Sequence, residues 1–563
     1  MNGISRREDT MNEVTPDLIA QIATRLYNEI PGAGEVPKSE ADLSPDRAAS
    51  YANAPTFGGD PSEAAQFREA PAGLDWHHLP STEAPSAPFI PSEAAIIPSA
   101  SPQSDTSGLA AFVRKVRSTN ARQDDGRCIG SLDQSHIQRI FGASAGAGKV
   151  PGGYETTGAR PLDIPAIRRD FPVLHQRVHG KELVWFDNAA TTQKPQSVID
   201  AVSRFYALDN SNIHRGAHTL AARSTDAYEQ ARQKIQKFIG AASPKEIIYV
   251  RGTTEGVNLV AQTWGRKFLQ PGDEILVSVL EHHANIVPWQ MIAKEKGAIL
   301  RPIPVNDNGE IMMEAYHALL GPRTRLVALT QASNTVGTIL PVQEMTQAAK
   351  RYGARVFIDG AQSVSHMPVN VQEIGCDFFV FSGHKIFAPM GIGAVYIREE
   401  VAEIMPPWQG GGNMIRNVTF EETTYNESPA KFEAGTPSVA DAVGLGAALD
   451  YVSRLGLVNT GRYEHELLTY ATEKLVRIDG VRILGNPKHK VSVISMILKD
   501  RHTEEVGKAL DQEGIAVRAG HHCSQPSLRR FGVEASVRPS FAFYNTFEEI
   551  DRLAEAIRRI LRK

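Results

Sequence analysis

Lys385 ends the turn Ser382–Lys385, which directly follows the apolar segment DFFVF. An amine at the end of a buried strand can hold an aldehyde cofactor as a Schiff base. Upstream, the segment RVFID ends at Asp359, whose carboxylate can pair with a protonated ring nitrogen. Pyridoxal phosphate (PLP) requires these two groups, so the pattern predicts a site for that cofactor.

A phosphate site is predicted beside this lysine. Residues 251–256, RGTTEG, follow a predicted strand and open a helix, so backbone N–H groups and the hydroxyl of Thr254 converge where the helix dipole favours an anion. Ser382 and His384, which precede Lys385 in the same turn, can close the other side of that phosphate.

Polar side chains follow two further predicted strands. His282 comes after the segment EILVS and could stack on an aromatic ring and transfer protons, while Asn334 comes after RLVALT. Open α/β sheets bind ligands along the carboxyl ends of their strands. We therefore expect all of these loops to meet in one crevice.

Cys523 is the candidate nucleophile. It lies in the loop RAGHHCSQP beside His521 and His522, with Arg518 nearby, and positive neighbours lower the pKa of a thiol and favour the thiolate. Cys376, in an apolar segment, is expected to be inert, and the role of Cys128 stays open. Three scattered cysteines predict neither a disulfide framework nor a metal site.

Beyond about residue 160, strands and helices alternate, which predicts a mostly parallel sheet covered on both faces. We expect an α/β protein with a seven-stranded large domain over residues 161–420 and a smaller α/β domain over residues 421–563. The large-domain strands are predicted at 246–250, 274–278, 298–305, 325–330, 355–359, 377–382 and 393–397. C-terminal strands are predicted near 481–485, 491–498, 515–519 and 537–544, with a closing helix near 547–561.

Residues 1–160 differ from the rest. They hold 14 of the 34 prolines and many small residues, a composition that predicts a largely disordered leader with short amphipathic helices. The clearest helix is TPDLIAQIATRLYNEI, with Thr15 as its N-cap and Ile22 and Leu26 on its apolar face. Such a helix either folds back on the catalytic part or docks on a partner. The start of translation could be Met1 or Met11.

Composition excludes several function classes. The net charge of −4 and the pI near 6.5 argue against a nucleic-acid-binding surface. No apolar run approaches the roughly 18 residues that span a bilayer, and the N-terminus lacks a secretory signal. The cysteine usage fits a reducing cytoplasm.

Ordered motifs carry a resemblance to a known family. The chain resembles the fold-type I, class V aminotransferase-like enzymes, and within them the SUF-type, group II cysteine desulfurases, from about residue 161 to the end. The motifs are NAATTQKP (188–195), RGTTEGVNLVAQTW (251–264), EHHANIVPW (281–289), IDGAQS (358–363), SGHK (382–385), FEAGTP (432–437), RAGHHCSQP (518–526) and VRPSFAFYNT (537–546).

The resemblance implies roles for cofactor-binding residues. Lys385 would hold PLP, Asp359 would bind its ring nitrogen, Gln362 would contact its ring hydroxyl and His282 would stack on its ring. The implied phosphate ligands are Thr254, Ser382 and His384, and Thr436 would reach the phosphate of the partner subunit in a homodimer.

It also implies a substrate site. Asn334 and Arg538 would grip the substrate carboxylate, for which a guanidinium fork is suited, with Arg518 beside them. His214 and Arg215 would form the rim of the active site.

The activity implied by the resemblance is conversion of L-cysteine to L-alanine, with the sulfur left as a persulfide on Cys523. The short HHC loop implies a dedicated sulfur-acceptor protein, as in iron–sulfur cluster assembly. Selenocysteine lyase is the alternative activity. The leader resembles those of cysteine desulfurases packaged inside encapsulin shells, through the segment IATRLYNEI (22–30), so an alternative of another class is a cargo or docking protein with secondary catalysis.

Overall fold

The computed structural model describes residues 162–214 and 216–562. The predicted leader, Cys128 and Arg215 therefore lie outside the described residues. Everything that follows concerns the described part of the chain.

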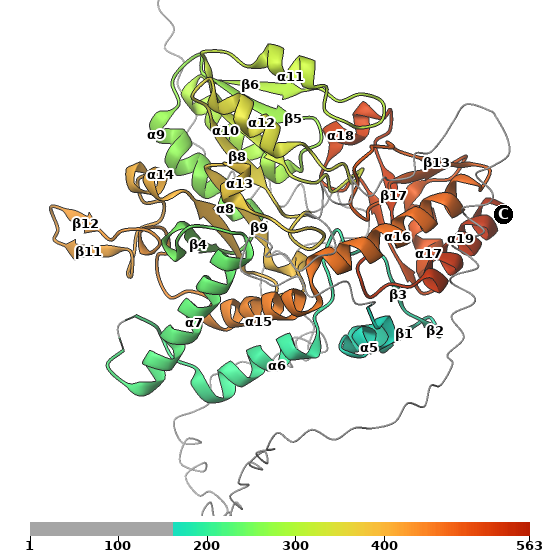
Figure 1. Cartoon of the computed structure of the whole chain (residues 1–563), viewed down its shortest axis with the longest axis horizontal. Helices are drawn as coiled ribbons and strands as arrows, with labels where there is room; N and C mark the ends of the chain where they lie inside the picture. Colours follow the sequence, from blue (N-terminus) through green and yellow to red (C-terminus); the bar gives the residue numbers. More distant parts are fainter. Residues whose placement is uncertain (1–161, 215, 563) are drawn as a thin grey trace, which may run out of the picture. The chain divides into compact units, whose positions relative to one another are not determined.

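A seven-stranded sheet forms the centre of the fold, with strand order β4-β10-β9-β8-β7-β5-β6 (Figure 1). The strands from β9 to β6 run parallel, whereas β10 is antiparallel to both of its neighbours. All seven predicted strands are confirmed, with ends within two residues of the prediction. They are β4 (Ile247–Val250), β5 (Glu274–Ser278), β6 (Ile299–Ile303), β7 (Thr324–Thr330), β8 (Arg355–Asp359), β9 (Phe378–Ser382) and β10 (Gly393–Ile397).

Side chains on successive strand residues enter different cores, as the two-residue period of a strand requires. In β9, Phe379 and Phe381 join one core, while Phe378 and Val380 join the other. The helices that supply the first core are α5 (Ile164–Arg169), α6 (Gln196–Arg204), α7 (Thr219–Phe238), α11 (Met313–Leu319), α12 (Val342–Lys350), α13 (Val371–Ile374), α15 (Val439–Leu455) and α18 (Gln525–Arg530). The second core is supplied by α8 (Thr253–Val260), α10 (Val287–Lys296) and α14 (Glu399–Ile404).

α15 packs on the helices of the large sheet, beside α6 and α7 (Figure 1). It lies beyond residue 420, the predicted division between domains. That division stays a prediction.

A four-stranded antiparallel sheet of order β13-β14-β17-β16 follows near the C-terminus. Its strands are β13 (Val481–Ile483), β14 (Met496–Leu498), β16 (Arg518–Gly520) and β17 (Ser536–Arg538). The helices of this region are α16 (Leu457–Val476), α17 (Thr503–Asp511), α18 (Gln525–Arg530) and α19 (Phe547–Arg562). α19 confirms the predicted closing helix.

The predicted C-terminal strands are longer than the observed ones. Residues 539–544 were expected to continue β17, but they are buried without extended strand pairing, so their apolar character reflects packing. The predicted strand 515–519 is two strands in different sheets: β15 (Ile515–Ala516) pairs in parallel with β3 (Val184–Trp185), and β16 pairs with β17.

Short elements complete the described fold. The hairpin β11 (Ile415–Val418) and β12 (Thr423–Tyr425) extends away from the large sheet, with Phe420 fully exposed in its turn (Figure 1). The others are β1 (Arg177–Val178), β2 (Lys181–Glu182), α9 (Arg266–Phe268), the π-helical segments Phe205–Asp209 and Ala261–Gly265, and the 3-10 turns Pro172–His175, Pro244–Glu246, His283–Asn285, Gly383–Lys385 and Ala430–Phe432.

Candidate active site

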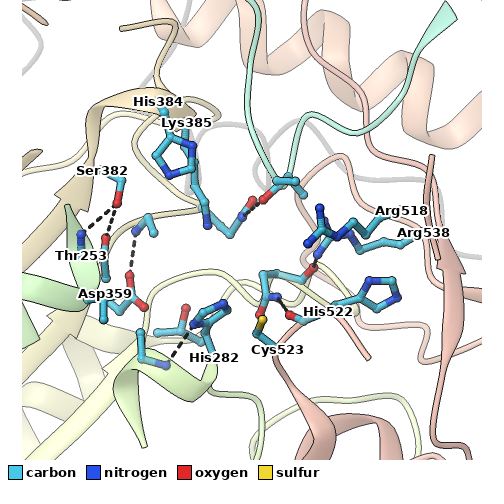
Figure 2. Close-up of a pocket in the computed structure, with 18 residues that line it drawn as sticks. Thr253, His282, Asp359, Ser382, His384, Lys385, Arg518, His522, Cys523 and Arg538 are labelled. Carbon is cyan, nitrogen blue, oxygen red and sulfur yellow. Dashed lines mark hydrogen bonds between the residues drawn. The ribbon is translucent and has the colours of Figure 1, made fainter. Parts of the chain in front are cut away.

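A cavity of about 240 Å³ lies at the carboxyl ends of the large sheet (Figure 2). It brings together eleven of the predicted site residues, from segments far apart in the sequence. These are Thr254, His282, Asn334, Asp359, Gln362, Ser382, His384, Lys385, Arg518, Cys523 and Arg538. The expectation of one crevice is therefore confirmed.

Lys385 reaches the cavity from the 3-10 turn that ends β9. The turn needs a glycine at position 383, because a Cβ there would lie 2.9 Å from the carbonyl oxygen of Ile392. Burial lowers the pKa of Lys385 to about 8, and the nearby Asp359 opposes this shift. Its amine can therefore accept a proton near neutral pH.

Asp359 ends β8 and Gln362 follows three residues later, and both line the cavity with Lys385. The N–H of Ala361 donates to Asp359 Oδ1 at 2.9 Å, and burial raises the pKa of this carboxyl group. A buried carboxylate that accepts one hydrogen bond still has acceptor sites with which it can bind a cationic group. Gln362 Nε2 donates to the carbonyl of Ala189 at 2.6 Å, which fixes the amide at the cavity wall.

The predicted phosphate end is a hydroxyl cluster at the N-terminus of α8. Ser382 Oγ accepts from the N–H of Thr253 at 2.8 Å and donates to Thr253 Oγ1 at 3.0 Å (Figure 2). A Cβ at Gly252 would lie 2.9 Å from Ser382 Oγ, so this position requires glycine. Thr253 was missed by sequence reasoning, which singled out Thr254 from the same turn.

His384 and His282 are both neutral side chains at ordinary pH. Burial lowers the pKa of His384 to about 4 and that of His282 to about 3. His282 Nδ1 accepts from the N–H of Ala284 at 3.0 Å, so its single proton belongs on Nε2. His282 can therefore donate a hydrogen bond from Nε2, but it is a much weaker base than Lys385.

Lys194 is a further residue that sequence reasoning did not single out. Its ammonium group donates to the carbonyl of His384 at 3.3 Å, and Thr191 Oγ1 donates to the same oxygen at 3.0 Å. Thr192 adds its backbone N–H at 3.0 Å. The segment that follows β3 thus holds the peptide next to Lys385. The only signal in the sequence was its place in the motif NAATTQKP.

The loop that carries Cys523 is held through its main chain. His522 and Cys523 both have φ of +53°, which is costly for residues other than glycine. The carbonyl of Cys523 accepts from the N–H of His283 at 2.7 Å, and Asn334 Nδ2 donates to the carbonyl of His522 at 2.8 Å. The N–H of Cys523 donates to His521 Nδ1 at 3.1 Å. These bonds fix the path of the loop.

One part of the predicted charge pattern around Cys523 is wrong. Burial, reinforced by Arg538 and Arg518, lowers the pKa of His522 to about 2, so this imidazole is neutral and supplies no positive charge to the thiol. Lys385 and Arg538 are cations in the cavity that interact electrostatically with Cys523. Cys376, as expected, is fully buried, and burial raises the pKa of its thiol.

Arg518 and Arg538 occupy directly opposed positions on β16 and β17. Arg538 is buried and donates through Nη1 to the carbonyl of Asn334 at 2.7 Å, whereas the Arg518 side chain is half exposed. Asp187, which has no role in the sequence prediction, lies 3.5 Å from Arg538 and 3.8 Å from Arg518.

Two predicted residues lie outside the cavity of their own chain. Thr436 is exposed, and His214 bonds through its ring to Asn413 and Glu229 at 3.2 Å each. Neither lines the cavity. Arg215 is not among the described residues.

Within the described ranges, no cluster of three or more potential metal ligands occurs. None of the helices in this part of the chain is long and apolar enough to cross a bilayer.

The class-V aminotransferase family model matches residues 184–553, and the chain belongs to this family. With its mostly parallel sheet, the chain has fold type I of the PLP-dependent transferases, as predicted. The family is PLP-dependent, and the site fits that cofactor: an amine, a buried carboxylate and a hydroxyl-lined helix N-terminus surround one cavity.

Within this family, the chain is similar to proteins named as cysteine desulfurases. The chain is 61% identical over 399 residues to a probable cysteine desulfurase of Mycolicibacterium paratuberculosis, covering 71% of this chain and 58% of the relative. It is 58% identical over 408 residues to a cysteine desulfurase of Synechococcus elongatus, covering 72% and 65%. The chain thus spans less than two thirds of these relatives. A crystal structure of the Escherichia coli cysteine desulfurase CsdA superposes with a TM-score of 0.67 at 38% identity, covering 72% of this chain and 99% of that one.

Proposed function

We propose that this chain is a PLP-dependent cysteine desulfurase that converts L-cysteine to L-alanine and carries the sulfur as a persulfide on Cys523. The observation that carries the proposal is that the thiol of Cys523 and the amine of Lys385 line one cavity, beside two arginines. The names of the relatives support this activity. An amine, a thiol and guanidinium groups are what the reaction needs.

The cofactor would be held by the residues of the sheet end. Lys385 would bind its aldehyde carbon, Asp359 its ring nitrogen, and Thr254, Ser382 and His384 its phosphate. Gln362 would contact the ring hydroxyl, and His282 would stack on the ring and donate from Nε2. When bound, PLP supplies an electron sink for the bonds at the substrate Cα.

The substrate would be oriented by its carboxylate. Arg538 is rigid because it is buried and bonded to the carbonyl of Asn334, and its Nε has no hydrogen-bond partner among the described residues. A guanidinium with unused donors suits a carboxylate. Binding there would place the substrate sulfur toward Cys523, with Lys385 available to take the Cα proton because its pKa is about 8.

Sulfur transfer would use the amine of Lys385 and the thiol of Cys523, which line the same cavity. The Cys523 thiolate attacks the substrate sulfur, an S–S bond forms, and the substrate C–S bond breaks with its electron pair left on carbon. A proton delivered to that carbon, together with return of the Cα proton from Lys385, gives L-alanine, and Cys523 retains the persulfide. Atoms and electrons balance without an external oxidant.

Replacement of Cys523 tests the proposal. Cys523→Ser should retain bound PLP, measured by its visible absorption, yet lose sulfide release from L-cysteine by about 10²-fold or more, because an alcohol is a poor nucleophile toward sulfur. The matched control is Cys376→Ser, which should cost stability, roughly 1–2 kcal/mol, but not the chemistry. Mass spectrometry that finds the persulfide on another cysteine, with Cys523 unmodified, would contradict the role.

The finer assignment to the SUF-type group is supported by the short, tethered cysteine loop. The carbonyl oxygen of His522 accepts a hydrogen bond from Asn334 Nδ2, and that of Cys523 accepts one from the His283 N–H. A loop so restrained cannot carry sulfur far, so we propose that an acceptor protein collects it.

A homodimer is supported by the two predicted site residues that lie outside their own cavity. Thr436 and His214 are exposed, and the exposed hairpin β11–β12 lies in the same stretch of chain as Thr436. We propose that Thr436, His214 and Arg215 serve the cavity of the partner copy.

The leader is assigned from sequence alone. Its proline-rich composition and the apolar residues of segment 22–30 support our proposal that it targets the cytoplasmic enzyme into an encapsulin shell.

A further inference from the structure

A buried glutamate precedes His282, whose imidazole would stack on the cofactor ring. Glu281 is fully buried and does not line the cavity. Its Oε1 accepts from the N–H of Thr330, the last residue of β7, at 2.9 Å. In the sheet Thr330 lies directly opposite Asp359, which would bind the ring nitrogen. Glu281 therefore joins the segment that carries His282 to the strand beside Asp359.

The other carboxyl oxygen of Glu281 closes the loop that holds His282. Asn285 Nδ2 donates to Glu281 Oε2 at 2.7 Å, and Asn285 Oδ1 accepts from Trp289 Nε1 at 2.9 Å. Within this loop, His282 Nδ1 accepts from the N–H of Ala284 at 3.0 Å, which restrains rotation of the imidazole. The direction of the imidazole thus depends on a loop whose two ends are bonded to each other.

The donors of this network determine which groups must accept. Because an indole N–H only donates, Asn285 must present Oδ1 to Trp289 and Nδ2 to Glu281. A backbone N–H also only donates, so both oxygens of Glu281 act as acceptors. A further hydrogen bond joins Oε1 to Ser278 Oγ at the end of β5. An amide in place of this carboxyl group would have to place its NH₂ group opposite one of two donors.

The pKa of Glu281 indicates that it acts through these bonds more than through charge. Burial, with a smaller contribution from Asp359, raises this pKa to about 8. The carboxyl group is therefore largely neutral at pH 7 and adds little negative charge beside Asp359. A glutamine in its place would keep the size and the low charge, but not the two acceptor oxygens.

We propose that Glu281 is a positioning residue, which holds the imidazole of His282 in a fixed place relative to the carboxylate of Asp359. This inference rests on the proposed function, in which these two groups face the ring and the ring nitrogen of PLP. It adds to that function a residue that lies outside the cavity wall and acts through another side chain.

Glu281→Gln tests the inference in the full-length protein. Either the Thr330 N–H or Asn285 Nδ2 would then face an NH₂ group, and a buried donor without an acceptor is costly. We expect the affinity of the cofactor-free protein for PLP, measured by titration of the visible absorption, to fall by about tenfold. The absorption band of the bound cofactor should also shift, because the surroundings of its ring change.

A second substitution should restore what the first removes. Asn285→Asp supplies an acceptor in place of Nδ2, to which the amide introduced by Glu281→Gln can donate, while the other aspartate oxygen still accepts from Trp289 Nε1. The double variant should therefore regain the PLP affinity and the absorption band of the unsubstituted protein. A loss of stability alone would not explain rescue by a reversed hydrogen bond.

The matched control is Glu246→Gln. Glu246 is also buried, and its oxygens accept from the backbone N–H groups of Ala242 at 2.9 Å and of Glu399 at 3.2 Å. It directly precedes β4 and does not line the cavity. Its replacement should lower the free energy of unfolding in urea, as Glu281→Gln does, yet leave the PLP affinity and absorption unchanged. Equal changes in PLP affinity and absorption in both variants would overturn the inference.

His282→Ala separates the inference from the proposed function. If this variant keeps the original PLP affinity and absorption, the proposed contact of His282 with the ring is wrong and the inference falls with it. If His282→Ala changes them but Glu281→Gln does not, or if Asn285→Asp gives no rescue, the inference is overturned while the proposed function stands. Added to His282→Ala, Glu281→Gln should cause no further shift of the absorption band, and a further shift would also overturn the inference.

Discussion

The two ends of the cavity are built in different ways. At the cofactor end, Asp359 ends the five-residue strand β8 and Lys385 lies in the turn after the five-residue strand β9, and both parallel strands are buried except for Arg355. At the thiol end, Cys523 stands in a loop of left-handed residues, and Arg538 ends a strand of only three residues. Sheet packing fixes the first end, whereas hydrogen bonds that Asn334 Nδ2 and the His283 N–H donate to the carbonyl oxygens of His522 and Cys523 fix the second.

This difference predicts how each end responds to change. A substitution at the cofactor end removes a group whose role no other residue can take over, so activity should be lost almost completely. At the thiol end several hydrogen bonds together position the cysteine loop, so the loss of one should lower activity only in part.

The largest effect is expected for Lys385→Ala. Without the amine, the protein should lose the covalently held cofactor and the proposed base together, and alanine formation from L-cysteine should fall by about 10³-fold or more. The control is Lys245→Ala, which replaces an exposed lysine. The assays are visible absorption after borohydride treatment and alanine production. A Lys385→Ala protein that still fixes PLP covalently would contradict the assignment.

A smaller effect is expected in the stability of the cofactor-free protein. The pKa of Lys385 is about 8 in the folded protein, against 10.5 for a free lysine, so the unfolded state binds more protons between these values. Stability should therefore rise as pH increases from 8 to 10.5. Lys385→Met removes the buried charge and should stabilise the protein by about 2–3 kcal/mol at pH 7.

Urea unfolding of the cofactor-free protein and of cofactor-free Lys385→Met, from pH 7 to 10, checks this prediction. The advantage of Lys385→Met should shrink as pH rises, and Lys245→Met should show no such trend. An advantage that grows with pH would show that Lys385 is not destabilised by burial.

The smallest effect is expected at the thiol end, for Asn334→Ala. Loss of its bond to the carbonyl of His522 should loosen the cysteine loop and lower sulfide release by about tenfold, while PLP absorption stays unchanged. The control is Asn459→Ala on α16. A variant that loses PLP as well as activity would show that the two ends are not independent.

The cofactor end could be predicted from the sequence because its signals are local. Continuous apolar segments identify buried strands, and a charged or hydroxyl residue directly after each strand identifies the site. In this way the sequence predicted that Asp359, Ser382 and Lys385 would meet, and all three line the cavity. Even the strand ends were nearly correct.

The rest depends on contacts between distant parts of the chain. Asp187 meets Arg538, and Lys194 meets the carbonyl of His384, only after folding brings their segments together. Likewise His522 is neutral because it is buried, and burial cannot be read from its sequence neighbours. The division of 515–519 into two strands has the same cause, since each half finds a different partner.

The contrast between Cys376 and Cys523 has a practical consequence for chemical labelling. Thiol reagents cannot reach Cys376, because it is fully buried and burial raises its pKa, whereas Cys523 faces the cavity. In a chain with Cys128 replaced by serine, an environment-sensitive fluorophore would attach at one position. Such a labelled protein would report directly on whatever enters or leaves the cavity, without any turnover.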